Sequence, residues 1–434
     1  SFKCHKNHYT IFWGIVVYLL DMNIAMFSDA FYPRINGVAI SVKSYAEALA
    51  ELGHNICIVC CNYEKPTREN HYHKFYYDEN VDIDKRIKVL RLPALNVSFS
   101  KEDKAARIDQ WHTCKREMDA FKPDIVHINS EFVIGYFGLT YARHRKIAMV
   151  YTFHTLWEDY AANYINFLPE RYSKKLAKEF IRFYLKRSDM IICPTERIQN
   201  VVREYKIERE SKILPTGIPK NVAEVKKGQK PLFHNQLYKG FPLKKKKRIL
   251  LYVGRVVKEK NLGFLFPVLE KVKKVYPDTM LVIVGGGPEL EPLQKQAENL
   301  KLAKNVCFTG YQSRDDLAYF YKLADVFVFP SVTETQGLVT IEAMMTGLPV
   351  VAIGEMGTVD VMQGDNGGFM VKHDAEEFSA KVLKLLSNKD LHEQKSKEAL
   401  EWSKKWSLPD LTNQLVDFYK EALEIRKQRN EARI

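Results

Sequence analysis

Short apolar runs, separated by segments with helical spacing, recur along the whole chain. Between the first two runs, apolar residues return at helical spacing over 38–52 and end at Gly53. Runs that are apolar throughout are typical of parallel strands buried on both faces. The order strand, loop, helix, strand predicts βαβ units. The strands predicted in the first half lie at 22–27, 56–61, 87–92, 124–128, 148–153 and 190–193.

The same pattern starts again after a stretch rich in proline, glycine and lysine at 214–248, which we interpret as an interdomain linker. We therefore predict an α/β protein of two Rossmann-like, doubly wound parallel-sheet domains that face a central cleft. The first domain is expected over 22–213 and the second over 249–400. The C-terminal helices, 401–434, are expected to pack back toward the first domain. Strands of the second half are predicted at 249–253, 280–284, 306–308, 326–329 and 349–353.

The first 21 residues stand outside this pattern. They contain an apolar run, 11–20, which is about half the length of a membrane span. A signal-peptide core is the other reading, but no small-residue cleavage site follows the run. We interpret 1–21 as an upstream extension of uncertain status. A short membrane-contacting segment is one interpretation of it.

The composition narrows the choice of partners. A chain of 434 residues with 46% hydrophobic and 27% charged residues suits two folded domains. The net charge of +13 favours anionic partners, or simply a basic surface, but no recognised nucleic-acid motif accompanies it. Cys57 and Cys60 fall on opposite faces of one predicted strand, so reduced thiols in a cytoplasmic protein explain them better than a metal site.

The segment 331–349 carries the strongest chemical signal. A strand ends at Pro330, and a helix is predicted from about Gly337 to Gly347. The free amides of Gly337, Leu338 and Val339 at the helix start can bind an anion. Glu334 lies before the helix, where it can contact a sugar hydroxyl. Glu342 lies inside the helix, where it can reach a nucleotide ribose; a capping arrangement with a surface glutamate is the alternative.

This segment resembles family-four glycosyltransferases, in which two glutamates separated by seven residues, then alanine and Gly-x-Pro, mark the donor site. Glu334 and Glu342 match that spacing. The resemblance spans about Met22 to the C-terminus. It implies the two-domain GT-B fold, a nucleoside-diphosphate sugar donor, retention of anomeric configuration and no required metal. We expect Gly254, Gly310 and Gln336 to belong to the donor site as well.

A second motif, 254–261, follows the first strand of the second domain. Arg255 and Lys260 are five residues apart, and two cations there can neutralise a diphosphate leaving group without a metal. Two surface cations near a helix start are the alternative. The resemblance assigns both residues to the diphosphate.

Two motifs of the first domain carry further expectations. The loop 31–38 resembles a family loop that usually holds paired glycines; here Asn36 replaces the first, which leaves Gly37 to approach the donor phosphate or the acceptor. His154, after a predicted strand, matches the family's active-site histidine, although a lone histidine is often structural. The string that follows resembles the acceptor region of bacterial diacylglycerol glucosyltransferases; it is Trp157, Glu158, Asp159 and Tyr160.

Two other patterns are interpreted as unrelated to catalysis. Asp82 and Asp84 form an Asp-x-Asp, the metal motif of another glycosyltransferase fold, but they lie in a polar turn away from the other motifs. The glycines 285–287 lack the spacing of a dinucleotide loop, so NAD binding is not expected. They are expected to line the nucleotide pocket instead.

The segment 171–187 predicts a basic amphipathic helix, with Lys175, Lys178 and Arg182 opposite an apolar stripe that includes Leu176 and Phe180. The stripe packs on the domain core or meets a membrane, and the cations attract anionic lipid in either case. We expect a hexosyltransferase that moves glucose or galactose from a UDP-sugar to a lipid, with 1,2-diacylglycerol as acceptor, peripheral on the cytoplasmic face of the cell membrane. A soluble or polyprenyl-linked sugar acceptor, and a non-catalytic sugar-nucleotide or membrane binding protein, are the alternatives.

Overall fold

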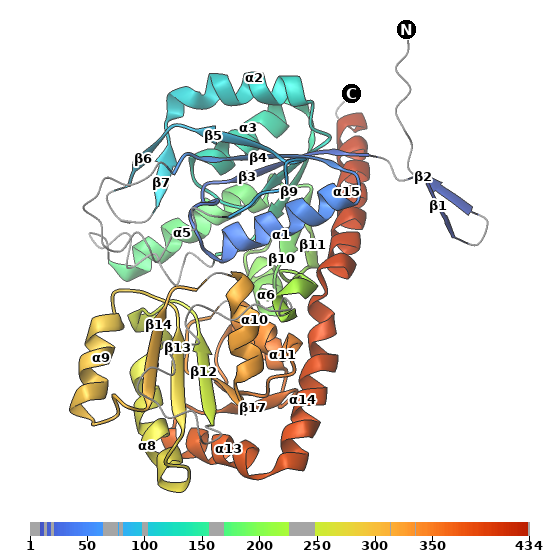
Figure 1. Cartoon of the computed structure of the whole chain (residues 1–434). Coiled ribbons are helices and arrows are strands. Elements are labelled where there is room, and N and C mark those ends of the chain that lie inside the picture. Colours follow the sequence, from blue (N-terminus) through green and yellow to red (C-terminus); the bar gives the residue numbers. More distant parts are fainter. Residues whose placement is uncertain are drawn as a thin grey trace. The chain divides into compact units, whose positions relative to one another are not determined.

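The computed structural model of the chain contains two compact α/β units (Figure 1). The structure describes residues 9–12, 15–18, 21–63, 77, 81–97, 103–155, 169–224, 248–312, 314–334 and 336–432. Among these, unit 1 comprises the residues up to Gly217 and from Leu408 onward, and unit 2 runs from Ile218 to Ser407. Most of the predicted linker, 225–247, lies outside the described residues.

Unit 1 is built on a parallel sheet of seven strands in the order β11-β10-β9-β8-β3-β4-β5. The chain moves outward from β3 on one side and then restarts at β8 on the other, so β3 and β8 flank a topological switch point. The strands are β3 (Asn23–Ser28), β4 (Asn55–Cys61), β5 (Lys88–Leu92), β8 (Ile125–Ile128), β9 (Ala148–Thr152), β10 (Met190–Cys193) and β11 (Glu210–Ile213).

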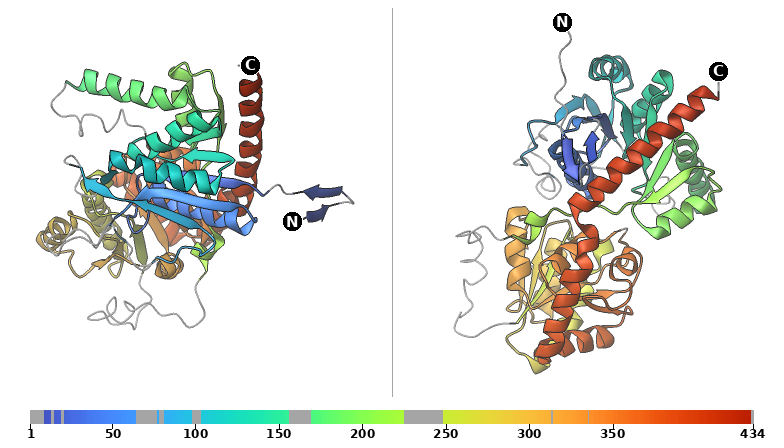
Figure 2. Two further views of the ribbon diagram at one scale, coloured as in Figure 1. Left: turned by 90° about the horizontal axis from the view of Figure 1, so that it is seen from above. Right: turned by 90° about the vertical axis from the view of Figure 1, so that its right-hand side faces the viewer.

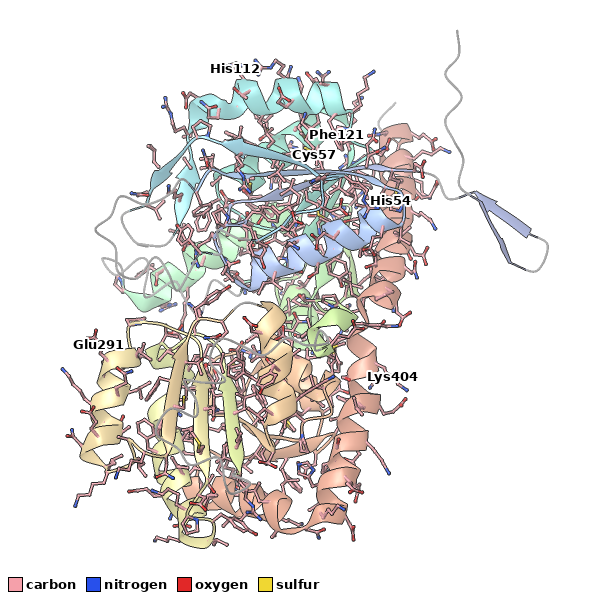
Figure 3. The ribbon with its side chains drawn as sticks, viewed as in Figure 1. His54, Cys57, His112, Phe121, Glu291 and Lys404 are labelled. Carbon is pink, nitrogen blue, oxygen red and sulfur yellow. The ribbon has the colours of Figure 1, made fainter. Side chains whose placement is uncertain are left out.

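Both faces of this sheet are buried. Strand β4 shows the alternation that this requires, because Cys57, which is labelled in Figure 3, packs into one core cluster and Cys60 into the other. One face is covered by α2 (Trp111–Phe121), α3 (Val133–Arg145), α5 (Glu170–Leu185) and α6 (Glu196–Glu204). The other is covered by α1 (Gly37–Glu51) and by the C-terminal helix α15 (Leu408–Glu431), which runs along unit 1 in Figure 2.

The C-terminal helix is fixed to unit 1 by specific polar contacts. The buried carboxylate of Asp189, which follows α5, forms ion pairs with Arg426 at 2.6 Å and Arg429 at 2.5 Å. Tyr419 hydrogen-bonds His127 of β8 at 2.7 Å in the interior. A buried charge is stable only when it is paired, so these contacts determine where α15 lies on the sheet.

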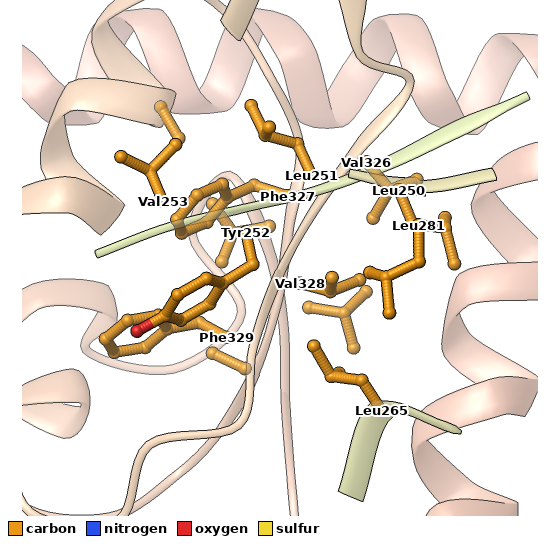
Figure 4. Close-up of a cluster of buried hydrophobic side chains, with 14 of the residues drawn as sticks. Leu250, Leu251, Tyr252, Val253, Leu265, Leu281, Val326, Phe327, Val328 and Phe329 are labelled. Atoms are coloured by element: carbon orange, nitrogen blue, oxygen red, sulfur yellow. The ribbon is translucent and has the colours of Figure 1, made fainter. Parts of the chain in front are cut away.

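Unit 2 has a parallel sheet of six strands in the order β14-β13-β12-β15-β16-β17, with its switch point between β12 and β15. Stacked rings of Tyr252, Phe327 and Phe329 lie at its centre (Figure 4). The strands are β12 (Ile249–Val253), β13 (Met280–Val284), β14 (Val306–Gly310), β15 (Val326–Phe329), β16 (Val350–Ile353) and β17 (Gly368–Val371). The helices are α8 (Leu265–Val275), α9 (Leu290–Asn299), α10 (Arg314–Leu323), α11 (Leu338–Met345), α12 (Gly357–Met362), α13 (Ala375–Ser387) and α14 (Lys389–Ser403).

Two small antiparallel ladders lie outside the two parallel sheets. β6 (Ala94–Asn96) pairs with β7 (Lys104–Ala106), after which η2 (Ile108–Gln110) leads into α2. Near the N-terminus, β1 (Tyr9–Phe12) pairs with β2 (Ile15–Tyr18), so part of the extension is a hairpin. Among the described residues, none of the helices combines the length and the hydrophobicity of a membrane span.

The sequence predicts reduced thiols, and the described part of the chain agrees with this. The six cysteines in that part form no disulfide. Burial raises the pKa of both Cys57 and Cys60 to about 12, which keeps these thiols protonated and unreactive.

Candidate active site

The loops after β12 and β15 of unit 2 lie at the switch point, where open α/β sheets bind their ligands. Arg255 follows β12, and Lys260 ends the short helix η4 (Lys258–Lys260). Glu334 follows β15. The topology therefore brings the two predicted donor motifs to neighbouring strand ends.

A buried ion pair joins these motifs. The Lys260 ammonium contacts the Glu334 carboxylate, and the two side chains keep only 10% and 18% of their exposure. The amide of Gly357 donates to the Glu334 carbonyl at 2.7 Å, so the backbone of this loop is also fixed. The pairing was not predicted, because the partners are far apart in the sequence and Lys260 was expected to face phosphate directly.

Arg255 is also paired, with Glu259 at 3.2 Å, but this pair is about half exposed. The hydroxyl of Tyr252 donates to the Arg255 carbonyl at 3.0 Å and so holds the loop against the end of β12. Both predicted phosphate-binding cations therefore have a carboxylate partner in this structure. Their contact with a diphosphate stays a prediction.

The glycines of these loops allow backbones to approach closely. A Cβ atom on Gly285 would lie 1.9 Å from the Gly254 carbonyl oxygen, and one on Gly287 would lie 2.2 Å from that of Val256. The Val256 amide donates to the Gly286 carbonyl at 2.9 Å. The run 285–287 thus packs the loop after β13 against the loop after β12. Gly310 has a positive φ of 71° and open space beside it.

Helix α11 begins with an uncapped N-terminus. Its N-cap, Gly337, adopts a left-handed φ of 61° and has no side chain that could cap the first amides of the helix. Leu338 and Val339 occupy the first helical positions, as the anion-site prediction requires. Glu342 is buried in the helix and accepts a hydrogen bond from the Tyr321 hydroxyl at 3.0 Å.

Several buried polar atoms around this helix start make no hydrogen bond to any residue that the structure describes. Buried polar groups are normally satisfied, so such a cluster indicates groups available to a polar ligand. This cluster adds residues to the predicted donor site. Of its members, only Gln336 was predicted from the sequence. The atoms are Ser331 Oγ, Gln336 Nε2, Thr340 Oγ1 and Thr358 Oγ1.

In unit 1, His154 follows β9, and its Nε2 lies 3.2 Å from Oδ1 of Asn129, which follows β8. Burial lowers the pKa of His154 to about 4, so the ring is neutral near pH 7. The amide oxygen accepts from Nε2–H, which leaves Nδ1 as the acceptor nitrogen. Asn129 was not predicted, since nothing in its local sequence distinguishes it.

Behind His154 lies a second buried histidine. His127 contacts Thr152 Oγ1 and Tyr419 Oη, each at 2.7 Å. Burial lowers its pKa to about 3. Both histidines line a cavity of about 10 Å³, roughly the size of one water molecule.

The loop before α1 explains why Asn36 stands where the family usually has the first of two paired glycines. Its side chain accepts from the Ala39 amide at 2.8 Å and caps the helix. A Cβ atom on Gly37 would meet nothing within 4 Å, and its φ is not positive. The fold itself therefore does not require a glycine at this position, which is consistent with space for a ligand.

The remaining predicted sites have mixed outcomes. The acceptor string, Trp157, Glu158, Asp159 and Tyr160, lies outside the described residues. Asp84 accepts from Arg86, and this hydrogen bond lowers its pKa to about 2. Within the described part of the chain, no three metal-ligating side chains come together.

The basic helix is α5, but its faces differ from the prediction. The buried side is formed by Ala177, Ile181 and Tyr184, whereas Leu176 and Phe180 are exposed. Packing of Leu176 and Phe180 on the core, one of the two alternatives, is therefore wrong, because the helix approaches the sheet through its small residues Ser173 and Ala177. Of the three predicted cations, Lys178 stacks on the Tyr205 ring and Arg182 pairs with Glu179, and both are half-buried, whereas Lys175 is exposed.

Comparison with known proteins settles the family. The model described as "Glycosyltransferase Family 4" matches residues 35–221, and "Glycosyl transferases group 1" matches 234–402. An α-monoglucosyldiacylglycerol synthase of Acholeplasma laidlawii is 31% identical over 385 residues, 87% of this chain and 92% of that protein. The chain belongs to glycosyltransferase family four.

Other relatives agree with this assignment. The α-monoglucosyldiacylglycerol synthase of Streptococcus pneumoniae is 29% identical over 77% of this chain and 71% of that protein. Among solved structures, a glycosyltransferase from Rickettsia africae superimposes with a TM-score of 0.71 at 18% identity, covering 93% and 99% of the two chains. Anabaena HepE in complex with UDP and glucose gives 0.66 at 14%, covering 91% and 98%. The family-four enzyme thus has the predicted GT-B fold.

Proposed function

We propose that this glycosyltransferase moves a hexose, glucose or galactose, from a UDP-sugar to a membrane lipid, with 1,2-diacylglycerol as the acceptor. The names of both synthases above describe glucosylated diacylglycerol as their product. UDP is bound in the HepE structure of the same fold. These similarities support the donor and acceptor classes.

The observation that carries the lipid acceptor is the exposed face of α5. Tyr172, Leu176 and Phe180 recur every four residues and are 62%, 55% and 40% exposed. Arg171 and Lys175 are exposed beside them. An apolar stripe flanked by cations is the pattern of a helix that lies in a membrane interface. The proposal therefore places the enzyme on an anionic membrane surface, at the cytoplasmic face.

The donor chemistry follows from the loops of unit 2. The amides at the start of α11, with Arg255 and Lys260, would stabilise the negative charge that develops on the leaving diphosphate. Glu334 would be held by Lys260 against the sugar, and Glu342, oriented by Tyr321, would bind the ribose. These groups are protein cations and amides, so we propose that no metal is required.

Vesicle binding tests the lipid surface. We expect the enzyme to sediment with anionic but not neutral vesicles, and binding should weaken with salt because the Debye length is about 8 Å at physiological ionic strength. Each exposed cation contributes about 1 kcal/mol near such a surface. Charge reversal of Arg171, Lys175 and Lys186 together should therefore abolish most binding.

The matched control reverses three exposed lysines of unit 2, Lys274, Lys304 and Lys397, and so makes the same change in net charge. It should bind vesicles nearly as well as the parent. If both triple variants lose binding equally, attraction is a property of the net charge and α5 is not the membrane contact.

A further inference from the structure

A large cavity opens in unit 1 next to the exposed stripe of α5. Its volume is about 930 Å³, at the upper end of the range for pockets that bind small molecules. Strand β7, the starts of α2 and α3, and α5 contribute its walls; β7 and α5 lie at the left of unit 1 in Figure 1. The apolar lining includes Ile108, Trp111, Val133, Tyr136, Phe137 and Phe180.

The rim of this cavity is unusually apolar for a surface in contact with water. Ile108 is 78% exposed, Tyr136 is 51% exposed and Phe180 is 40% exposed. Phe180 also belongs to the exposed stripe of α5, so the rim and the stripe form one apolar surface. Contiguous apolar surface of this kind marks a site for a membrane, a partner or an apolar ligand.

The carboxylates in the lining, those of Glu131, Asp109 and Asp103, already have protein partners. The Tyr151 hydroxyl donates to the Glu131 carboxylate, and the Tyr184 hydroxyl donates to the Glu131 carbonyl at 2.6 Å. Asp109 pairs with Arg107 at 2.8 Å, and Asp103 with Arg34 at 3.4 Å. The cavity therefore offers largely apolar walls, and its carboxylates are committed to protein partners, which suits hydrocarbon better than a sugar or a phosphate.

We propose that this cavity holds one hydrocarbon chain of the lipid acceptor. The inference rests on the proposed function and adds to it the place where the enzyme binds the acyl chain. The cations of α5, Arg171 and Lys175, bring the rim to an anionic bilayer. A hydrocarbon chain that enters past Ile108 and Phe180 moves from the apolar bilayer interior to the apolar walls of the cavity. It therefore leaves the membrane without exposure to water.

Trp111 allows the occupant to be detected directly. Its ring lies in the cavity wall, 5.6 Å from that of Phe137. Brominated hydrocarbon quenches tryptophan fluorescence on contact. The full-length enzyme is mixed with saturating phosphatidylglycerol vesicles that contain diacylglycerol with brominated chains, and the parent is compared with Trp111→Phe. Saturation removes any difference in vesicle binding from the comparison.

The parent should lose more fluorescence than Trp111→Phe, and the difference should be larger with brominated diacylglycerol than with brominated phosphatidylglycerol. A filling variant, Thr140→Phe, should remove that difference, whereas Val275→Phe, on an exposed helix end of unit 2, should keep it. Equal quenching of the parent and Trp111→Phe overturns the proposal. Quenching of Trp111 by brominated phosphatidylglycerol but not by brominated diacylglycerol also overturns it.

This experiment does not require sugar transfer. Quenching of Trp111 by diacylglycerol, without any glycosylated lipid, would retain the cavity as a hydrocarbon site and reject the proposed acceptor chemistry. Glycosylated diacylglycerol without quenching of Trp111 would retain the function and reject this cavity as the acyl-chain site.

Discussion

Replacement of Lys260 by alanine separates a structural role of this lysine from a catalytic one. The Lys260 ammonium pairs with the largely buried Glu334 carboxylate, and the motif also assigns it to the diphosphate. Lys260→Ala should therefore reduce both the stability of unit 2 and the turnover number. The two losses have different causes, and they can be measured independently.

The expected loss of stability follows from the burial of the pair. Removal of one partner of a buried ion pair costs about 3–5 kcal/mol, and the 10% and 18% exposure of these side chains favours the lower end. For a unit of this size, 1 kcal/mol lowers the melting temperature by about 2–4 °C, so a shift of roughly 6–12 °C is expected. Loss of a charge that stabilises the transition state should reduce kcat by roughly 10²-fold or more.

A double-mutant cycle with Glu334→Gln provides the assay. Lys260→Ala with Glu334→Gln leaves no unpaired charge, so most of the lost stability should return in thermal unfolding. Turnover should stay low, since Arg255 is then the one predicted cation left to face the diphosphate. The reasoning is refuted if Lys260→Ala retains near-normal kcat while folded. It is also refuted if kcat returns with stability in the double variant, because Lys260 would then act only through Glu334.

Three further predictions concern metal, backbone and protonation. Activity should survive excess EDTA; complete loss that Mg²⁺ or Mn²⁺ restores would reject the metal-free donor site. Gly285→Ala should destabilise unit 2 severely, because its Cβ would lie 1.9 Å from a carbonyl oxygen, whereas Gly37→Ala should keep the parent's melting temperature and lower kcat/KM; unchanged kcat/KM would remove Gly37 from the site. The pKa of His127 is lowered from its ordinary 6.5 to about 3 by burial, so the unfolded chain takes up the proton first and stability should fall as pH drops from about 6.5 toward 3. Urea unfolding at several pH values should show a shallower dependence for His127→Asn, and an unchanged slope would contradict this assignment.

Most strands that are buried on both faces could be predicted from sequence, although the largely buried β17 was missed. β10, β12, β13 and β15 have the predicted bounds, because a run such as Ile249–Val253 is apolar at every position. β11 was missed, since Glu210–Ile213 is a polar strand at the edge of the sheet. Such a strand is specified by its neighbour β10 more than by its own residues.

The motifs of the candidate site could be predicted from the sequence, but the contacts between their side chains could not. Glu334 and Lys260 were found separately from local strings, but their ion pair depends on the adjacency of β12 and β15. The helical wheel also placed Leu176 and Phe180 on the same side of α5 as the buried Tyr184, and this was wrong for a related reason. A helical wheel counts apolar residues, whereas the actual buried face also depends on small residues such as Ser173 and Ala177, which permit close packing.

The central claim, sugar transfer from a UDP-sugar to diacylglycerol at a membrane, is tested most directly by one measurement. The purified enzyme is incubated with radiolabelled UDP-glucose or UDP-galactose and anionic vesicles that contain diacylglycerol, and the lipid fraction is then extracted. We expect the label in a monohexosyl diacylglycerol, with a yield that depends on the anionic lipid. Label that stays in the aqueous phase with both donors, while a soluble or polyprenyl-linked sugar acceptor is glycosylated, would contradict the claim.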